Sequence, residues 1–159
     1  MSRVGGSYDR RESLKRGVYL LPNLVTTGGI FAGCYGIVST MNGHYDLAAW
    51  LILISAVFDA LDGKVARLTG TTSRFGVEYD SLVDLVSFGV APGLLMYSWA
   101  LQSFGKFGWL EAFLYVVCGA LRLARFNVQV GTVESRRFVG LPMPVAAGMV
   151  GFVVLLFDH

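Results

Sequence analysis

Four aspartates lie near the middle of the chain, at spacings that a helix would bring onto one face. Asp59 and Asp62 are three residues apart. Asp80 and Asp84 are four residues apart, so each pair lies on one side of its helix. Gly70–Thr72 supplies a turn between the two pairs. We therefore expect two antiparallel helices that bring the four carboxylates to one point.

Carboxylates gathered in this way suit divalent cations. Four of them repel one another unless positive charge lies among them. Oxygen ligands without His or Cys favour Mg²⁺, Mn²⁺ or Ca²⁺ over zinc. Four carboxylates could hold two such ions, the arrangement that stabilises the attacking and leaving oxygens in phosphoryl chemistry.

The residues around the aspartates suit a ligand that carries phosphate. Lys64 and Arg67 supply positive charge for phosphate oxygens. Gly63 and Gly76 lack side chains, so a ligand could approach the backbone closely. These residue types predict chemistry on a phosphate ester. The structural alternative is a ring of salt bridges from the aspartates to Lys64 and Arg67.

The elements that must position these residues are long apolar helices. Of the 159 residues, 54% are hydrophobic and only 15% are charged, whereas a soluble domain carries about 25% charged residues. Apolar runs cover residues 18–41, 47–58, 82–101, 107–121 and 138–157.

A membrane-spanning helix needs roughly 20 mainly apolar residues. The two short runs reach that length if Asp59–Leu68 and Arg122–Arg125 continue their helices. The sequence therefore predicts an all-α fold: a polytopic transmembrane helix bundle with five spans, forming a single domain over residues 1–159. A soluble helical bundle is the alternative.

The basic residues predict the orientation of this bundle. With the N-terminus in the cytoplasm, only Lys106 of the 13 Lys and Arg residues lies on the outer side, as the positive-inside rule requires. The protein is then integral to the cytoplasmic membrane, with the aspartates facing the cytoplasm. Residues 1–17 are predicted to form a short juxtamembrane amphipathic helix whose basic residues meet lipid headgroups. No basic patch interleaved with aromatic residues suggests a nucleic-acid partner.

The central stretch also matches a family motif. Its pattern D-x2-D-G-x2-A-R-x8-G-x3-D-x3-D is made by Asp59, Asp62, Gly63, Ala66, Arg67, Gly76, Asp80 and Asp84. This pattern resembles the signature of the CDP-alcohol phosphatidyltransferase family. Four further stretches are similar to the membrane-type phosphatidylserine synthases of bacteria and archaea: Pro22–Gly29, Tyr79–Gly93, Ala120–Val128 and Phe138–Gly148. Phosphatidylglycerophosphate synthases typically have D-P-x-A-D-K where this chain has DSLVD, which favours serine as the acceptor.

The resemblance implies an integral membrane enzyme, usually a homodimer with six spans in each protomer and surrounded by membrane lipids. It would transfer the phosphatidyl group from CDP-diacylglycerol to the hydroxyl of L-serine, giving phosphatidylserine and CMP. Mg²⁺ or Mn²⁺ would serve as cofactor, with two ions expected and Ca²⁺ as a substitute. The chain stops after the fifth predicted span, at FVVLLFDH. Either the C-terminal part is truncated or this member is short.

Local chemistry and the resemblance together suggest a role for each residue. Asp59, Asp62 and Asp80 would hold the first metal ion. Asp84 would help complete the second site and act as general base for the serine hydroxyl. The residues expected to bind the CDP-lipid are Asn23, Thr26, Asp62, Gly63, Ala66, Arg67 and Gly76. For Asn23 and Thr26, helix packing through small polar side chains is the alternative.

A zwitterionic acceptor needs a cation for its carboxylate and an acceptor for its ammonium group. Arg122, Arg125 and Asn127 are the candidates for binding serine or a phosphate. The alternative is that the two arginines reach lipid headgroups. Two other functions stay open: a sister enzyme that uses glycerol 3-phosphate or an inositol phosphate, and a divalent-cation transporter.

Overall fold

The computed structural model describes residues 6–70, 73–130 and 142–157, with side chains described within 23–65, 68, 70, 73–128 and 142–157. Within these ranges the chain is helical and contains no β-strand. The elements are α1 (Gly6–Met41), α2 (Tyr45–Thr69), α3 (Arg74–Asp84), the π-helix η1 (Leu85–Val90), α4 (Ala91–Trp99), the 3₁₀-helix η2 (Leu101–Phe104), α5 (Lys106–Val130) and α6 (Met143–Phe157).

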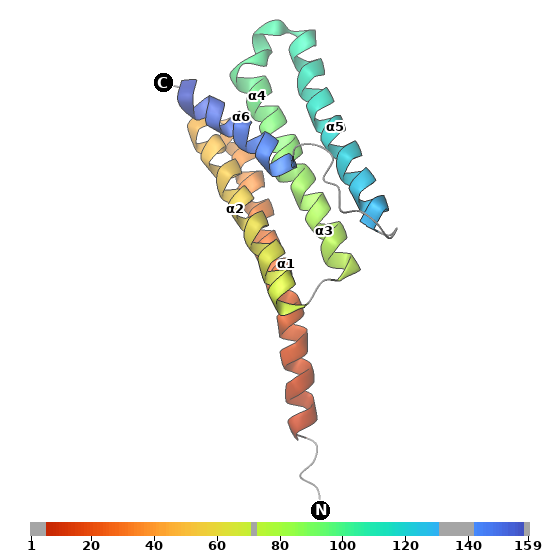
Figure 1. The fold of residues 1–159 in the computed structure, drawn as a ribbon. Helices are drawn as coiled ribbons and strands as arrows, with labels where there is room; N and C mark the ends of the chain where they lie inside the picture. Colours follow the sequence, from red (N-terminus) through yellow and green to blue (C-terminus); the bar gives the residue numbers. More distant parts are fainter. Residues whose placement is uncertain (1–5, 71–72, 131–141, 158–159) are drawn as a thin grey trace, which may run out of the picture.

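The helices form an elongated bundle (Figure 1). α1 packs against α2 in an antiparallel hairpin, and the N-terminal part of α1 extends beyond the bundle. α3, η1 and α4 follow one another as a single helical stretch from Arg74 to Trp99, and α5 returns beside it. α6 crosses over α2, η1 and α4. The two helices expected to carry the aspartates, α2 and α3, therefore lie in one bundle.

The predicted all-helical class is confirmed, and the two short apolar runs continue as predicted, whereas the number of five spans stays a prediction. α2 continues through Asp59–Leu68, and α5 continues through Arg122–Arg125. Within the part of the chain that the structure describes, three stretches could cross a membrane by length and composition: Asn23–Met41, Arg74–Trp99 and Lys106–Val128. α6 is apolar but shorter, with 15 residues. α2 has 25 residues and carries the charged motif in its C-terminal half. These helices are typical of a polytopic membrane bundle, while the orientation predicted from the basic residues stays a prediction.

One predicted element differs. Residues 6–17 do not form a separate juxtamembrane helix, because α1 is continuous from Gly6 to Met41. The stretch Glu12–Arg16 consists mainly of good helix formers. Neither a turn nor a helix end separates it from the apolar part of the helix. Residues 1–5 of the predicted juxtamembrane segment lie outside the described range.

Small residues bring the helices together between the start of α2 and the aspartates. Ala48 and Ala49 of α2 are fully buried, as is Ala147 of α6. Such residues let helix backbones approach closely, which is how helices associate in membranes. Ser55 Oγ on α2 donates a hydrogen bond of 2.9 Å to the carbonyl oxygen of Gly29 on α1. The α1–α2 contact is thus fixed one helical turn before Asp59.

The π-helix η1 follows Asp84 directly and packs on α1. A β-carbon placed on Gly33 of α1 would lie 2.9 Å from Ser87 Cβ and 3.0 Å from Ser87 Cα. These distances are too short for any residue larger than glycine without movement of the backbone. A π-segment shifts the register of a helix and often occurs at functional sites. Here it follows the aspartate pair of α3 and contains the core residue Phe88, which is 1% exposed.

We predict that Gly33→Ala destabilises the protein, because η1 must move away from α1. Overpacking of this kind costs about 1–3 kcal/mol, more than the gain of up to about 1 kcal/mol in helix propensity. The matched control is Gly36→Ala, where the new β-carbon would meet its neighbours at an ordinary 3.6 Å. Thermal unfolding of the detergent-solubilised variants checks this, and equal midpoints for the two variants would contradict it.

Candidate active site

The turn between α2 and α3 sets the two aspartate pairs opposite each other. α2 ends at Thr69, and Gly70 adopts a φ of 62°, a left-handed conformation that glycine tolerates best. Ser73 then caps α3, where its Oγ accepts a 3.0 Å hydrogen bond from the backbone N–H of Gly76. The predicted turn at Gly70–Thr72 lies between these two ends, although Thr71 and Thr72 are outside the described residues. α3 therefore runs back along α2.

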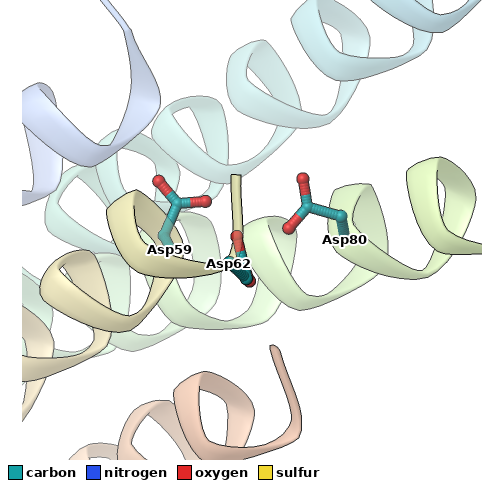
Figure 2. Close-up of side chains that lie close together, drawn as sticks. All are labelled: Asp59, Asp62 and Asp80. Carbon is teal, nitrogen blue, oxygen red and sulfur yellow. The ribbon is translucent and has the colours of Figure 1, made fainter. Parts of the chain in front are cut away.

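The structure brings the predicted carboxylates together (Figure 2). Asp59 and Asp62 of α2 and Asp80 of α3 each offer an oxygen within 4.8 Å of the others. The carboxyl group of Asp84 contacts that of Asp59. All four aspartates line one small pocket between α1, α2 and α3. Three of the carboxylates could hold a metal ion, and the fourth lies beside them.

The buried oxygens of this pocket test whether a cation fits. Thr26 Oγ1 of α1 donates a 2.8 Å hydrogen bond to Asp62 Oδ2. Asp80 Oδ1 and Asp84 Oδ1 are buried, and no described group donates to them. A buried acceptor left without a partner costs about 1–3 kcal/mol, and more when it is charged. A donor set made only of oxygens, with two of them unsatisfied, fits a hard divalent cation.

The salt-bridge alternative receives no support from the described side chains. Among the described side chains, no positively charged group forms an ion pair with any of the four aspartates. Lys64 is exposed. The side chains of Ala66 and Arg67 are outside the described residues, so their predicted contacts with the CDP-lipid stay predictions.

The α1 residues predicted to bind the CDP-lipid lie at two depths. Thr26 is 5% exposed and belongs to the aspartate pocket. Asn23 lies nearer the start of α3, where its Oδ1 would be 3.7 Å from a β-carbon on Gly76. This is an ordinary contact distance, and the nearer neighbour of that β-carbon is the capping Ser73 Oγ, at 3.1 Å. Gly63 follows Asp62 directly in α2.

Motif reasoning missed four further residues that line the aspartate pocket: Gly29, Ser55, Val83 and Phe88. Ser55 is four residues before Asp59, and Phe88 is four residues after Asp84. This spacing places each of them on the same helix face as its aspartate. A search for same-face neighbours of the motif would have found both.

The candidates on α5 separate in the structure. Asn127 contacts α3, where its Nδ2 donates a 3.0 Å hydrogen bond to Glu78 Oε2 and its Oδ1 accepts one of 3.1 Å from Ser81 Oγ. Arg122 is partly buried and Arg125 is exposed, and neither lines the aspartate pocket. The structure thus joins Asn127 to the helix of Asp80, whereas the roles of the two arginines stay predictions.

Known proteins match both the motif and the rest of the chain. The sequence pattern of the CDP-alcohol phosphatidyltransferase family matches residues 19–159. A CDP-diacylglycerol–serine O-phosphatidyltransferase from Helicobacter pylori is 47% identical over 139 residues, covering 87% of this chain and 59% of that protein. An archaetidylserine synthase from Methanothermobacter thermautotrophicus is 44% identical over 129 residues, covering 80% of this chain and 54% of that protein.

A third relative, a CDP-diacylglycerol–serine O-phosphatidyltransferase from Mycobacterium leprae, is 43% identical over 142 residues, which cover 86% of this chain and 46% of that protein. The chain therefore spans about half of the length of these curated relatives. The match to the family pattern covers most of the chain, including both aspartate pairs and all the candidate residues from Asn23 to Asn127. The chain belongs to the CDP-alcohol phosphatidyltransferase family.

Proposed function

We propose that this chain carries the catalytic centre of a CDP-diacylglycerol–serine O-phosphatidyltransferase. The observation that carries the proposal is the gathering of Asp59, Asp62 and Asp80 within 4.8 Å, beside the buried and unsatisfied oxygen of Asp84. Two of the relatives are named for transfer to serine, and the third for making archaetidylserine. These names support serine as the acceptor and a CDP-linked lipid as the donor.

The four aspartates would hold Mg²⁺ or Mn²⁺, with two ions expected from the number of carboxylates. Bound there, the ions would offset negative charge on the diphosphate and on the departing CMP. Thr26 keeps the carboxylate of Asp62 oriented through its hydrogen bond. In this proposal Thr26 acts by positioning a ligand.

The transfer itself is a displacement at the phosphorus that bears diacylglycerol. The serine hydroxyl oxygen forms a bond to this phosphorus, and the bond from the phosphorus to the CMP oxygen breaks. CMP leaves with the electron pair, and the hydroxyl proton passes to the carboxylate of Asp84. Asp84 suits this role because one of its oxygens is buried and has no described donor.

The donor lipid would enter from the side of α1 and the start of α3. Asn23 and Gly76 lie against each other there, close to the first turn of α3. Gly63, Ala66 and Arg67 continue along α2 from Asp62, and Arg67 would pair with diphosphate oxygens. The one-sided distribution of basic residues supports a site on the cytoplasmic face. A homodimer rests on the resemblance to the family.

The test is an acceptor screen with the detergent-solubilised protein and radiolabelled CDP-diacylglycerol. We expect CMP release with L-serine, and much less with glycerol 3-phosphate or an inositol phosphate. EDTA should abolish the release, and added Mg²⁺ or Mn²⁺ should restore it. Release with another acceptor but not with serine would identify a sister enzyme. An absence of release with every acceptor would refute the proposed activity, and full activity in EDTA would refute the metal site.

In the same assay, Asp84→Asn should lower kcat by at least about a hundredfold, the usual contribution of a general base. Its control is Asp46→Asn, which changes a carboxylate at the first turn of α2, far along the helix from Asp59. A near-normal kcat for Asp84→Asn would mean that another group takes the hydroxyl proton.

We predict that Asp80→Asn weakens the binding of divalent cations, because it removes a charge from the group of three carboxylates. Titration of the purified protein with Mn²⁺, followed by electron paramagnetic resonance, measures this without turnover. Asp46→Asn again serves as control and should bind Mn²⁺ as the native protein does. Equal affinities for the native protein and Asp80→Asn would contradict a metal site at this cluster.

We also predict that Arg122 or Arg125 binds the carboxylate of serine. Replacement of that arginine by Ala should raise KM for serine at least about tenfold, since hydrogen bonds to charged groups contribute about 1.5–3 kcal/mol. KM for CDP-diacylglycerol should change little. Ethanolamine, which lacks the carboxylate, should be a poor acceptor for the native enzyme, and the variant should discriminate less against it.

The control for this prediction is Lys106→Ala, at the opposite end of α5. Equal rises in both KM values would place the arginine on the lipid diphosphate. An unchanged KM for serine in both arginine variants would assign the arginines to lipid headgroups.

A further inference from the structure

A tyrosine of α5 completes the backbone hydrogen bonding of η1. Tyr115 Oη donates a hydrogen bond of 3.0 Å to the carbonyl oxygen of Phe88. In an α-helix this oxygen accepts from the N–H group four residues later. That residue is Pro92, which has no N–H. Phe88 is buried, and a buried carbonyl group needs a partner. Tyr115 supplies the donor that the chain itself lacks at this position.

The hydrogen-bond pattern of the helix changes just before Pro92. The backbone N–H of Ala91 donates to the carbonyl oxygen of Val86, five residues earlier, and α4 begins at Ala91. A proline inside a helix also crowds the carbonyl group four residues before it. The wide turns of η1 therefore end where Pro92 interrupts the ladder, with the carbonyl oxygen of Phe88 bonded to α5.

α5 lies close to this part of the helix. A β-carbon on Gly93 would lie only 3.0 Å from Val116 Cγ2 and 3.6 Å from the carbonyl oxygen of Ala112. The glycine therefore lets α5 approach α4 beside Tyr115, and α5 runs back along the whole stretch (Figure 1). Tyr115 does not line the aspartate pocket, whereas Phe88 does. An effect of Tyr115 on the aspartates must consequently pass through η1.

η1 determines which face of α3 is turned toward α2. A turn closed by a bond to the fifth residue contains one residue more than an α-helical turn. Each residue of an α-helix turns the chain by roughly 100°. If η1 became α-helical, α3 would rotate by about this angle relative to α4. Asp80 and Asp84 would then turn away from α2, and Ser87 would leave its contact with Gly33.

Repulsion between the carboxylates favours such a rotation when no cation is bound. Asp80 of α3 lies within 4.8 Å of Asp59 and Asp62 of α2. The carboxyl group of Asp84 contacts that of Asp59. Turning α3 would separate these groups and relieve the repulsion. The contacts that hold η1 in place must therefore oppose the repulsion, and the hydroxyl of Tyr115 makes one of them.

We infer that Tyr115 is a positioning residue whose hydroxyl holds η1 and thereby keeps Asp80 and Asp84 turned toward α2. The inference rests on the proposed function and adds to its site a residue that lies outside the motif. A divalent cation binds the arrangement in which the carboxylates converge, so the cation and the hydroxyl stabilise the same state. Loss of the hydroxyl should lower the affinity for the cation, and excess cation should restore the arrangement.

Tyr115→Phe tests this inference because it removes only the hydroxyl group. Titration with Mn²⁺, followed by electron paramagnetic resonance, should show an apparent Kd at least about fivefold higher, the effect of one hydrogen bond. This midpoint does not depend on the fraction of protein that is folded. In the CMP-release assay with serine, the rate at limiting Mn²⁺ should fall by a similar factor. Saturating Mn²⁺ should bring kcat close to the native value.

The matched control is Tyr45→Phe. Tyr45 Oη donates a hydrogen bond of 3.3 Å to the carbonyl oxygen of Ser98, near the end of α4 and away from the aspartates. This variant loses the same kind of bond from the same helical stretch, and it should keep the native affinity for Mn²⁺. An unchanged affinity in Tyr115→Phe, or equal losses in the two variants, would overturn the inference. A loss of kcat that saturating Mn²⁺ does not restore would also overturn it.

Gly33→Ala tests η1 from its other side, because the new β-carbon pushes Ser87 away from α1. It should likewise raise the apparent Kd for Mn²⁺, whereas Gly36→Ala should not. A native affinity in Gly33→Ala would overturn the link between η1 and the carboxylates. Failure of the native protein to release CMP with any acceptor would refute the proposed function, while the Mn²⁺ titrations would still decide the inference. Failure of the native protein to bind Mn²⁺ would overturn both.

Discussion

Repulsion between buried carboxylates is the constraint on which this structure depends. Two like charges about 4 Å apart repel each other by about 4 kcal/mol at the effective dielectric of a protein site. The group of Asp59, Asp62 and Asp80 contains three such pairs within 4.8 Å, and Asp84 adds to them. An apolar bundle of this size cannot lose that much stability without compensation. Protonation of a carboxyl group or a bound cation would relieve this repulsion, and the three clustered carboxylates could hold such a cation.

The packing around the pocket keeps the carboxylates from moving apart. On one side, Ser55 ties α2 to the backbone of α1. On the other, Gly33 allows η1 to lie directly on α1, so that α3 cannot move away without opening this contact. The turn at Gly70 and the cap at Ser73 fix the distal end of the hairpin. The geometry of the site is thus set by close backbone contacts on both of its sides.

The part of this arrangement that the sequence predicts is the part encoded by local periodicity. The spacing within each aspartate pair, together with a turn of known position, determines where two helices bring them together. The link from Asn127 to Glu78 joins residues 49 apart in the chain, and no periodic pattern predicts which faces of α3 and α5 meet. The periodicity of the sequence likewise does not predict the π-helix, because apolar residues occupy the inward positions of an α-helix and of a π-helix alike. The continuous α1 shows the same limit, since a change of composition at Gly17 does not end a helix.

α3 carries different side chains on its two sides. Its Asp80 and Asp84 face the pocket shared with α1 and α2, whereas Glu78 and Ser81 face α5. A displacement at phosphorus requires the attacking and leaving oxygens to lie roughly in line. The acceptor hydroxyl must then approach the phosphorus from the side opposite to the departing CMP. In the proposed reaction, the diphosphate would lie at the aspartates on the side of α2. Asp84 is the last residue of α3 before η1, and it lines the same pocket as the other three aspartates.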